Sequence, residues 1–185
     1  MFKIRDLFHL RVGRPNPKHK RQPGTTRYIT GSLFNNGCTD HVGNTDGIHA
    51  VSGITVVRAG STGSTFYQPA PFYPAENLFT LTPKTPITDE IGIFLATIIE
   101  VLCLEHEQYV YKNKPKIGTL GNNEIPLPVT ETEEPDWGVY TRLHVRHTVR
   151  RLHGNRKQCR VINAETKHSC WSRIRYRTTW TRLQR

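Results

Sequence analysis

Two stretches of opposite character meet near residue 141, and this boundary limits what the chain can fold into. Residues 1–141 carry 13 lysines and arginines against 14 acids, and their apolar residues recur in regular patterns. Residues 142–185 carry 13 lysines and arginines against one acid, and their apolar residues keep neither the helical nor the strand period. We therefore expect a nearly neutral folded domain over residues 1–140 and an irregular basic tail over 141–185.

The length and composition suit one globular domain. A chain of 185 residues can bury a substantial core, and 36% hydrophobic with 22% charged residues argues against wholesale disorder. No apolar run is long enough to span a membrane, and the N-terminus lacks the apolar region of a secretory signal. The four cysteines have no paired spacing, so we expect no disulfide framework and a location in the reducing cytoplasm. They are Cys38, Cys103, Cys159 and Cys170.

The apolar patterns predict strands around one main helix. Residues 88–106 are expected to form that helix, because Thr88 or Asp89 can cap it and apolar residues recur at intervals of three and four. This spacing places Ile91, Phe94, Leu95, Ile98, Ile99 and Leu102 on one face. The β-branched run at 53–58 predicts a buried strand. The other expectations are a strand or short helix at 2–10, an exposed basic loop at 14–23, strands at 27–30 and 77–81, a turn at 35–37, a small-residue loop at 59–65 and an extended segment at 125–129.

Two motifs in the sequence could carry chemistry. Gly60 and Gly63 enclose hydroxyl residues after the buried strand, but the loop lacks the lysine of a P-loop, so nucleotide binding is disfavoured. A loose Mg²⁺-dependent nuclease pattern joins Asp136 to Glu165 and Lys167, with acids to hold the metal and a lysine to polarise a phosphate. Its long spacer falls in the patternless tail. A nuclease therefore stays as the enzymatic alternative.

The tail offers two further interpretations. Its histidines and cysteines fit no common zinc-site spacing, so we expect no metal site there. They are His144, His147, Cys159, His168 and Cys170. Arginines alternate with aromatic residues over 171–182, which suits phosphate contact and base stacking. Non-specific nucleic-acid binding through the tail alone is the third hypothesis.

Several segments, taken in order, resemble the target-recognition domain of restriction–modification specificity subunits, the type I S-subunit class with its type IIG and IIB relatives. Their order and spacing over residues 2–137 make the resemblance specific. The segments are Phe8 with Gly13, YIT at 28–30 before NNG at 35–37, GSTGSTFYQ at 60–68, NLFTL at 77–81 before Pro83 and Lys84, FLATIIE at 94–100, and IPLPV at 125–129 with PDW at 135–137.

This resemblance implies an α/β (α+β) domain, with a mixed twisted sheet, one main amphipathic helix and long loops, that contacts half of a split target in double-stranded DNA. It implies no catalysis and no cofactor in this chain. In such systems S-adenosylmethionine, ATP and Mg²⁺ belong to partner modification and restriction subunits. The sequence agrees, because it contains neither a methyltransferase motif nor a helicase P-loop.

The resemblance also suggests which side chains meet DNA, since amide, hydroxyl and guanidinium groups read base edges and lysines contact phosphates. Asn35 and Asn36 are candidates that could equally be turn formers, and Tyr67 could equally be a core aromatic. The full set is Asn35, Asn36, Arg58, Ser61, Thr62, Ser64, Tyr67 and Gln68 for bases, with Lys18, Lys20 and Arg21 for phosphates.

The chain departs from the family pattern after Trp137. A full specificity subunit carries two recognition domains and long spacer helices, whereas this sequence has room for one domain followed by the tail. We expect a single-domain or degenerate specificity fragment, truncated or frame-shifted after about residue 137. A homodimer of such fragments would supply the second recognition domain.

Overall fold

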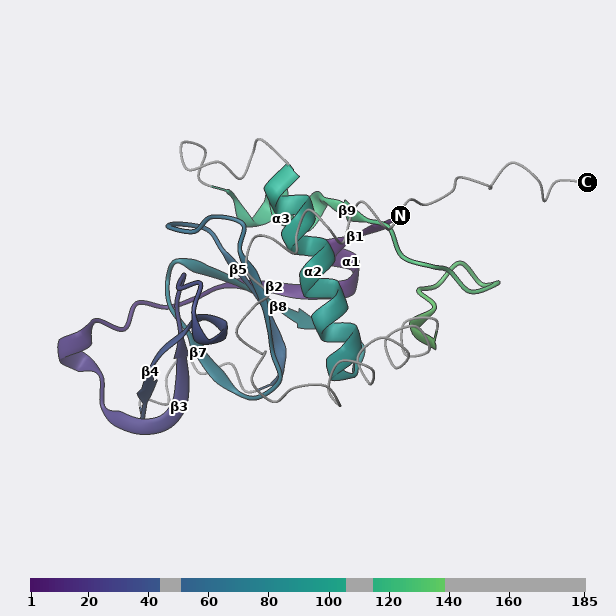
Figure 1. Ribbon diagram of the computed structural model, residues 1–185. Helices are drawn as coiled ribbons and strands as arrows, with labels where there is room; N and C mark the ends of the chain where they lie inside the picture. Colours follow the sequence, from purple (N-terminus) through teal and green to yellow (C-terminus); the bar gives the residue numbers. More distant parts are fainter. Residues whose placement is uncertain (44–50, 106–114, 139–185) are drawn as a thin grey trace, which may run out of the picture. The chain divides into compact units, whose positions relative to one another are not determined.

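The computed structural model describes residues 1–43, 51–105 and 115–138 (Figure 1). Small sheets and short helices surround one long helix. In chain order the elements are β1 (Phe2–Lys3), α1 (Ile4–Leu7), β2 (Phe8–Val12), η1 (Lys18–Lys20), β3 (Pro23–Ile29), η2 (Asn35–Gly37), β4 (Cys38–Val42), β5 (Gly53–Val57), β6 (Thr65–Gln68), β7 (Phe72–Pro74), β8 (Leu78–Pro83), α2 (Asp89–Glu105), α3 (Ile117–Asn122) and β9 (Glu124–Ile125).

The central sheet has the strand order β2-β8-β5-β6, with every neighbouring pair antiparallel. All residues of β5 are buried, which confirms the buried strand predicted at 53–58. Ile54 and Val56 point to one face of this sheet and Val57 to the other, because successive side chains alternate. Both faces of the central sheet are therefore covered.

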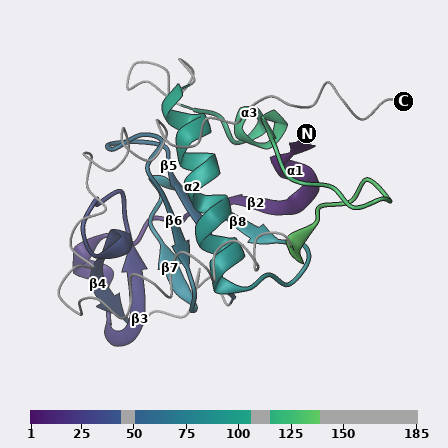
Figure 2. The same cartoon turned by 45° about the vertical axis from the view of Figure 1, so that its right-hand side comes forward.

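Helix α2 covers the first face (Figure 2). Its observed bounds match the predicted helix at 88–106, and the Ile91 backbone N–H donates to Thr88 Oγ1 at 3.5 Å. Ile91, Leu95 and Ile99 are buried against Ile54 and Val56. The three-and-four spacing of these apolar residues thus produces the contact that it predicts.

A second sheet, of order β4-β3-β7, lies on the other face. Ile29 and Phe72 from this sheet pack against Val57 and Leu78 of the central sheet. Strand β3 pairs antiparallel with β4 and parallel with β7. We call β3 and β4, with the turn that joins them, the β3–β4 hairpin.

Residues 2–10 were expected to form a strand or a short helix, and they contain both. Strand β1 pairs with β9, α1 makes a single turn, and β2 then enters the central sheet. Ile4 lies at 0% exposure with Leu120 and Ile125, so these terminal elements close one end of the core. In the described ranges, no helix is long and apolar enough to cross a membrane.

The Tyr67 hydroxyl donates a hydrogen bond to Asp89 Oδ1 at 2.8 Å and so links β6 to the start of α2. Burial raises the pKa of this hydroxyl above its ordinary value of 10.0; Ser52 opposes the shift and Asp89 adds to it. A raised pKa means that the folded state favours the protonated phenol, whose stabilisation is complete below pH 10.0 and is lost as the pH rises through the folded-state pKa.

Tyr67→Phe is therefore expected to lower the free energy of unfolding by about 1 kcal/mol at neutral pH, through loss of the hydrogen bond. The variant should also lose less stability than the wild type between neutral pH and about pH 11. Urea denaturation at both pH values measures this difference. Equal losses in the two proteins would contradict the assignment.

Candidate nucleic-acid interface

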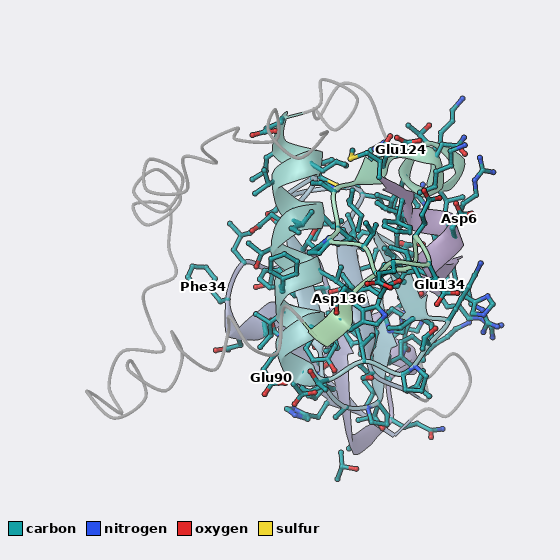
Figure 3. All side chains as sticks on the ribbon, turned by 90° about the vertical axis from the view of Figure 1, so that its right-hand side faces the viewer. Asp6, Phe34, Glu90, Glu124, Glu134 and Asp136 are labelled. Carbon is teal, nitrogen blue, oxygen red and sulfur yellow. The ribbon has the colours of Figure 1, made fainter. Side chains whose placement is uncertain are left out.

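The near-neutral net charge of the folded region conceals a strong internal separation. Residues 11–43 contain six lysines and arginines and a single acid, Asp40. The described residues from 51 to 138 contain three lysines and arginines against ten acids. Figure 1 places the β3–β4 hairpin on one side of the central sheet and residues 115–138 on the other, and Figure 3 shows Glu124, Glu134 and Asp136 on this second side. We call residues 11–43 the basic side, and α2 with residues 115–138, which carry nine of those ten acids, the acidic side. The tenth acid, Glu76, lies beside the basic side, because its neighbour Ala75 pairs with Arg14.

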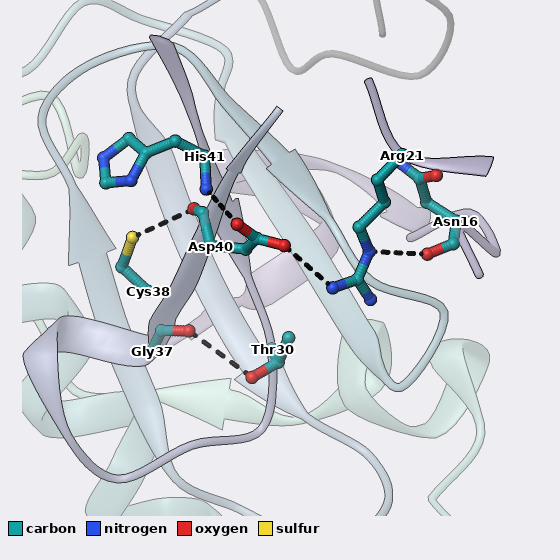
Figure 4. A network of polar contacts seen from close by, with 7 residues as sticks. All are labelled: Asn16, Arg21, Thr30, Gly37, Cys38, Asp40 and His41. Carbon is teal, nitrogen blue, oxygen red and sulfur yellow. Dashed lines mark hydrogen bonds and ion pairs between the residues drawn. The ribbon is translucent and has the colours of Figure 1, made fainter. Parts of the chain in front are cut away.

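Arg21 links the basic loop before β3 to the hairpin through hydrogen bonds (Figure 4). Its Nε donates to the Asn16 carbonyl at 2.9 Å and its Nη1 to Asp40 Oδ2 at 3.1 Å. Its guanidinium carbon lies 4.1 Å from the centre of the Tyr28 ring. Arg21 is thus engaged within the protein, in contacts that fix the loop.

Lys18, His19 and Lys20 form η1 in this loop, and all three are exposed. The His41 backbone N–H and then the Arg21 side chain hold the pKa of Asp40 below its ordinary value. The acid that faces the basic loop is therefore charged at neutral pH and stays paired with Arg21. Lys18 and Lys20 both lie exposed beside the hairpin.

The turn at 35–37 forms as predicted, with left-handed backbone at Asn35 (φ 51°), Asn36 (φ 55°) and Gly37 (φ 78°). Asn36 Nδ2 donates to the Tyr67 carbonyl at 2.7 Å and to Gln68 Oε1 at 3.3 Å. Gln68 Nε2 donates back to the Asn36 carbonyl at 3.0 Å. We call this reciprocal pair the Asn36–Gln68 clamp. It holds the turn against the end of β6.

The clamp separates the roles of the predicted base readers. Gln68 lies at 0% exposure, and its Nε2 is also 3.4 Å from Thr55 Oγ1, so it faces the protein interior. Tyr67 is buried on the α2 side of the sheet. Asn36 is half-buried within the clamp, whereas Asn35 is exposed. Of these four residues, Asn35 presents its side chain to solvent.

The small-residue loop between β5 and β6 is closed by its own backbone. The N–H of Thr62 donates to the Gly60 carbonyl at 2.8 Å, and that of Gly63 to the Val57 carbonyl at 2.8 Å. These internal bonds leave those N–H groups without the open geometry of a phosphate cradle. Ser64 is buried and Ser61 is half-buried. Arg58 is also half-buried, with its guanidinium carbon 5.5 Å from the centre of the Phe79 ring.

The structure divides the predicted site residues into two groups. A Cβ on Gly31 would lie 3.3 Å from the Ala59 carbonyl oxygen, so the turn region and the small-residue loop lie side by side. Lys18, Lys20 and Arg21 precede the start of β3, while the Arg21 side chain reaches Asp40 and Tyr28 further along the hairpin. The strand begins opposite Val42 and ends opposite Cys38, four residues apart on β4, which is about 13 Å at the usual rise.

Two features of the basic side were not predicted from the sequence. Arg27 and His41 are paired across the hairpin, and Asn16 is buried within the otherwise exposed loop predicted at 14–23. The sequence does reveal the basic side, but only when net charge is summed over residues 11–43 by themselves. The signal disappears when charge is summed over the whole folded region, because the acidic side cancels it.

A family model described as the type I restriction modification DNA specificity domain matches residues 1–143. The chain belongs to this family. The predicted family and the function of a DNA sequence-recognition module are therefore confirmed. No curated protein is similar enough in sequence to count as a relative.

Solved structures show the same fold. A type I restriction–modification S subunit from M. genitalium aligns with TM-score 0.52 and 16% identity over 66% of this chain and 32% of its own. The HsdS subunit from Thermoanaerobacter tengcongensis aligns with TM-score 0.54 and 12% identity, over 84% of this chain and 40% of its own. A third structure, from work on complex assembly and conformational transition of the type I R-M system, aligns with TM-score 0.56 and 17% identity. The alignment covers 81% of this chain and 38% of that one.

The chain thus spans 32–40% of the length of these structures. The likeness confirms the mixed α+β fold that we expected for the specificity domain. The three relatives come from specificity subunits or from the type I system, and none of the comparisons supports the nuclease alternative.

Several predictions concern residues outside the described ranges. These are the irregular tail, the zinc-like set at 144–170 and two of the three proposed nuclease residues, Glu165 and Lys167. The third, Asp136, accepts a hydrogen bond from the Gly138 backbone N–H at 2.9 Å. Among the described residues, no group of three or more His, Cys, Asp or Glu side chains could hold a metal ion.

Proposed function

We propose that this specificity domain binds double-stranded DNA with its basic side, and that the β3–β4 hairpin provides the contacts. The observation that carries this proposal is the concentration of six cations against one acid on residues 11–43, while α2 and residues 115–138 hold nine acids against one lysine. Strand β3 pairs with β7 at Arg27–Ile29 and with β4 alone before that, where the hairpin is a two-stranded antiparallel ribbon of a width that the major groove admits. A basic ribbon therefore matches both the shape and the charge of a DNA groove.

The two ends of the hairpin suit different contacts. Lys18 and Lys20 are exposed at one end, where they can neutralise phosphates and set the register on the duplex. Asn35 is exposed at the other end, and an asparagine amide can pair with N6 and N7 of adenine. The ends of β3 are about 13 Å apart, which corresponds to roughly four base pairs at 3.4 Å per step.

Partly or fully buried residues then position these contacts. Arg21 fixes the loop that carries the lysines, and the Asn36–Gln68 clamp fixes the turn that carries Asn35. A contact group whose backbone is already fixed loses less entropy on binding, so preorganisation raises both affinity and selectivity. Arg21, Asn36 and Gln68 thus contribute to binding by holding the lysines and Asn35 in position.

We assign no catalysis to this domain. Modification and restriction subunits would supply the chemistry, together with S-adenosylmethionine, ATP and Mg²⁺, on cytoplasmic DNA. The acidic side faces away from the proposed duplex, which leaves it accessible to those subunits. A second recognition domain, from a longer chain or from a second copy, would read the other half of a split target.

Selection of binding sites from random duplexes with the full chain tests this proposal. We expect a short consensus, and Asn35→Gly should relax it at one position with a loss of about 1–3 kcal/mol against the preferred base. Glycine is the chosen replacement because it accepts the left-handed backbone at this position (φ 51°). A phosphate-only role would instead weaken binding equally on all sequences, and recovery of no consensus by the wild type would reject sequence-specific binding by this chain.

A further inference from the structure

The turn between β3 and β4 carries two neighbouring apolar side chains in solvent. Leu33 is 55% exposed and Phe34 is 73% exposed. Phe34 is the one aromatic residue among the exposed large hydrophobic side chains of the described ranges. Figure 3 shows its ring projecting from the edge of the domain. Single exposed apolar residues are ordinary, so the setting of this pair decides its meaning.

The backbone holds Phe34 in place from both sides. Its N–H donates to Ser32 Oγ at 3.1 Å, and its carbonyl accepts from the Gly37 N–H at 3.0 Å. The next two residues, Asn35 and Asn36, have left-handed backbone, which side chains other than glycine adopt at some energetic cost. The Asn36–Gln68 clamp stabilises this conformation. The fold therefore fixes the backbone from which the exposed aromatic ring projects.

The position of the ring points to DNA as its partner. Phe34 is the immediate neighbour of Asn35, at the end of a hairpin whose surrounding residues 11–43 carry six lysines and arginines against one acid. Such a surface attracts a phosphate backbone. Two side chains alone are also much smaller than the apolar patch of several hundred Å² that marks a protein-docking site.

We propose that Phe34, supported by Leu33, is an apolar wedge that enters the DNA base stack beside the position that Asn35 reads. Resting on the proposed function, this inference adds a mode of recognition, because a wedge unstacks one base step and selects for steps that unstack easily. Pyrimidine–purine steps are the expected choice, since they open most readily. The wedge would thus contribute specificity without a hydrogen bond to a base.

The test uses the full chain and its selected duplex with 2-aminopurine placed at successive positions, because this base fluoresces more strongly when it is unstacked. Wild type should raise the fluorescence at one step. Phe34→Ala should abolish that rise and weaken binding by about 5- to 150-fold, the range found when an aromatic that stacks on a base is removed. Phe34→Trp should retain both the rise and most of the affinity.

Leu104→Ala provides the matched control, because this side chain is 53% exposed on α2, outside the hairpin. It should change neither signal. A mismatch at the responsive step should strengthen binding by wild type more than binding by Phe34→Ala. A mismatched step costs less free energy to unstack, and only the wild-type ring has to unstack it. Identical melting curves for all variants would show that the exposed substitutions leave the fold intact.

Two results would overturn the wedge while leaving DNA recognition intact. One is equal affinity and equal fluorescence for wild type and Phe34→Ala. The other is unchanged DNA affinity in Phe34→Ala together with lost assembly with a modification subunit, which would place the ring in a protein contact. Failure of the wild type to bind any duplex would instead reject the proposed function and the wedge together.

Discussion

Replacing both Lys18 and Lys20 by glutamate is expected to lower the affinity of the full chain for its selected duplex roughly 100-fold, if each reversal costs about 1.4 kcal/mol. Each substitution removes a cation from the exposed end of the basic loop and places a negative charge there. A filter-binding or fluorescence-anisotropy titration at fixed salt measures the change. The slope of the logarithm of the binding constant against the logarithm of the salt concentration should also become shallower by about one for each lost phosphate contact.

Lys84→Glu with Lys116→Glu is the matched control. Both lysines are exposed, both lie outside residues 11–43, and the pair changes net charge by the same amount. Because the control leaves the basic loop intact, we expect a much smaller loss of affinity. Equal losses in the two double variants would show that only total charge matters, and would contradict an interface on the hairpin.

Gly92→Val is expected to destabilise the fold by about 1–3 kcal/mol, because it forces a branched side chain into a closed contact. A Cβ at Gly92 would lie 2.5 Å from Tyr67 Cδ2 and 2.7 Å from its Cζ. The ring cannot move away at low cost, since it is 7% exposed and its hydroxyl is bonded to Asp89. Chemical denaturation of the full chain measures the loss.

Gly118→Ala separates this packing effect from helix propensity. Gly118 lies in α3, and a Cβ there would meet no atom within 4 Å. The substitution should therefore be neutral, or stabilise by up to about 1 kcal/mol through better helix propensity. A Gly92→Val protein as stable as the wild type would mean that α2 does not pack on β6 as described.

The contact at Gly92 also bears on recognition. Tyr67 and Gln68 are adjacent in β6, and they face opposite sides of the sheet. Tyr67 contacts α2, whereas Gln68 holds Asn36 in the clamp. A shift of β6 away from its place under α2 would therefore disturb the turn that presents Phe34 and Asn35.

Local patterns were sufficient to predict the elements that have strong local signals. The helix at 88–106 follows from its apolar spacing and its cap, and the buried strand at 53–58 from its β-branched run. The left-handed turn follows from two asparagines and a glycine at 35–37. In each case the side chains within one short window specify the backbone.

The missed elements lack such local signals. Strand β4 reads CTDHV, in which Val42 is the one buried residue, and it forms because β3 pairs with it. Strand β7 has three residues. Helix α3 has six residues, two of which are glycines with low helix propensity. Pairing and docking with distant segments determine all three.

The site could be predicted in part for the same reason. The sequence identifies Asn35, Asn36 and Gln68 as polar candidates, but the clamp joins residues 32 positions apart. The Arg21–Asp40 pair joins residues 19 positions apart. No window of the sequence shows which polar side chain faces solvent and which is buried, so the distinction between contact and positioning residues required the fold.

The central claim is that the basic hairpin, rather than the acidic side or the tail, meets DNA. Hydrogen–deuterium exchange of the full chain, with and without its selected duplex, tests this claim most directly. We predict that the duplex slows amide exchange over residues 18–42 and leaves residues 89–105 and 115–138 unchanged. Slowing confined to those two acidic ranges, or to residues 142–185, would contradict the proposed interface.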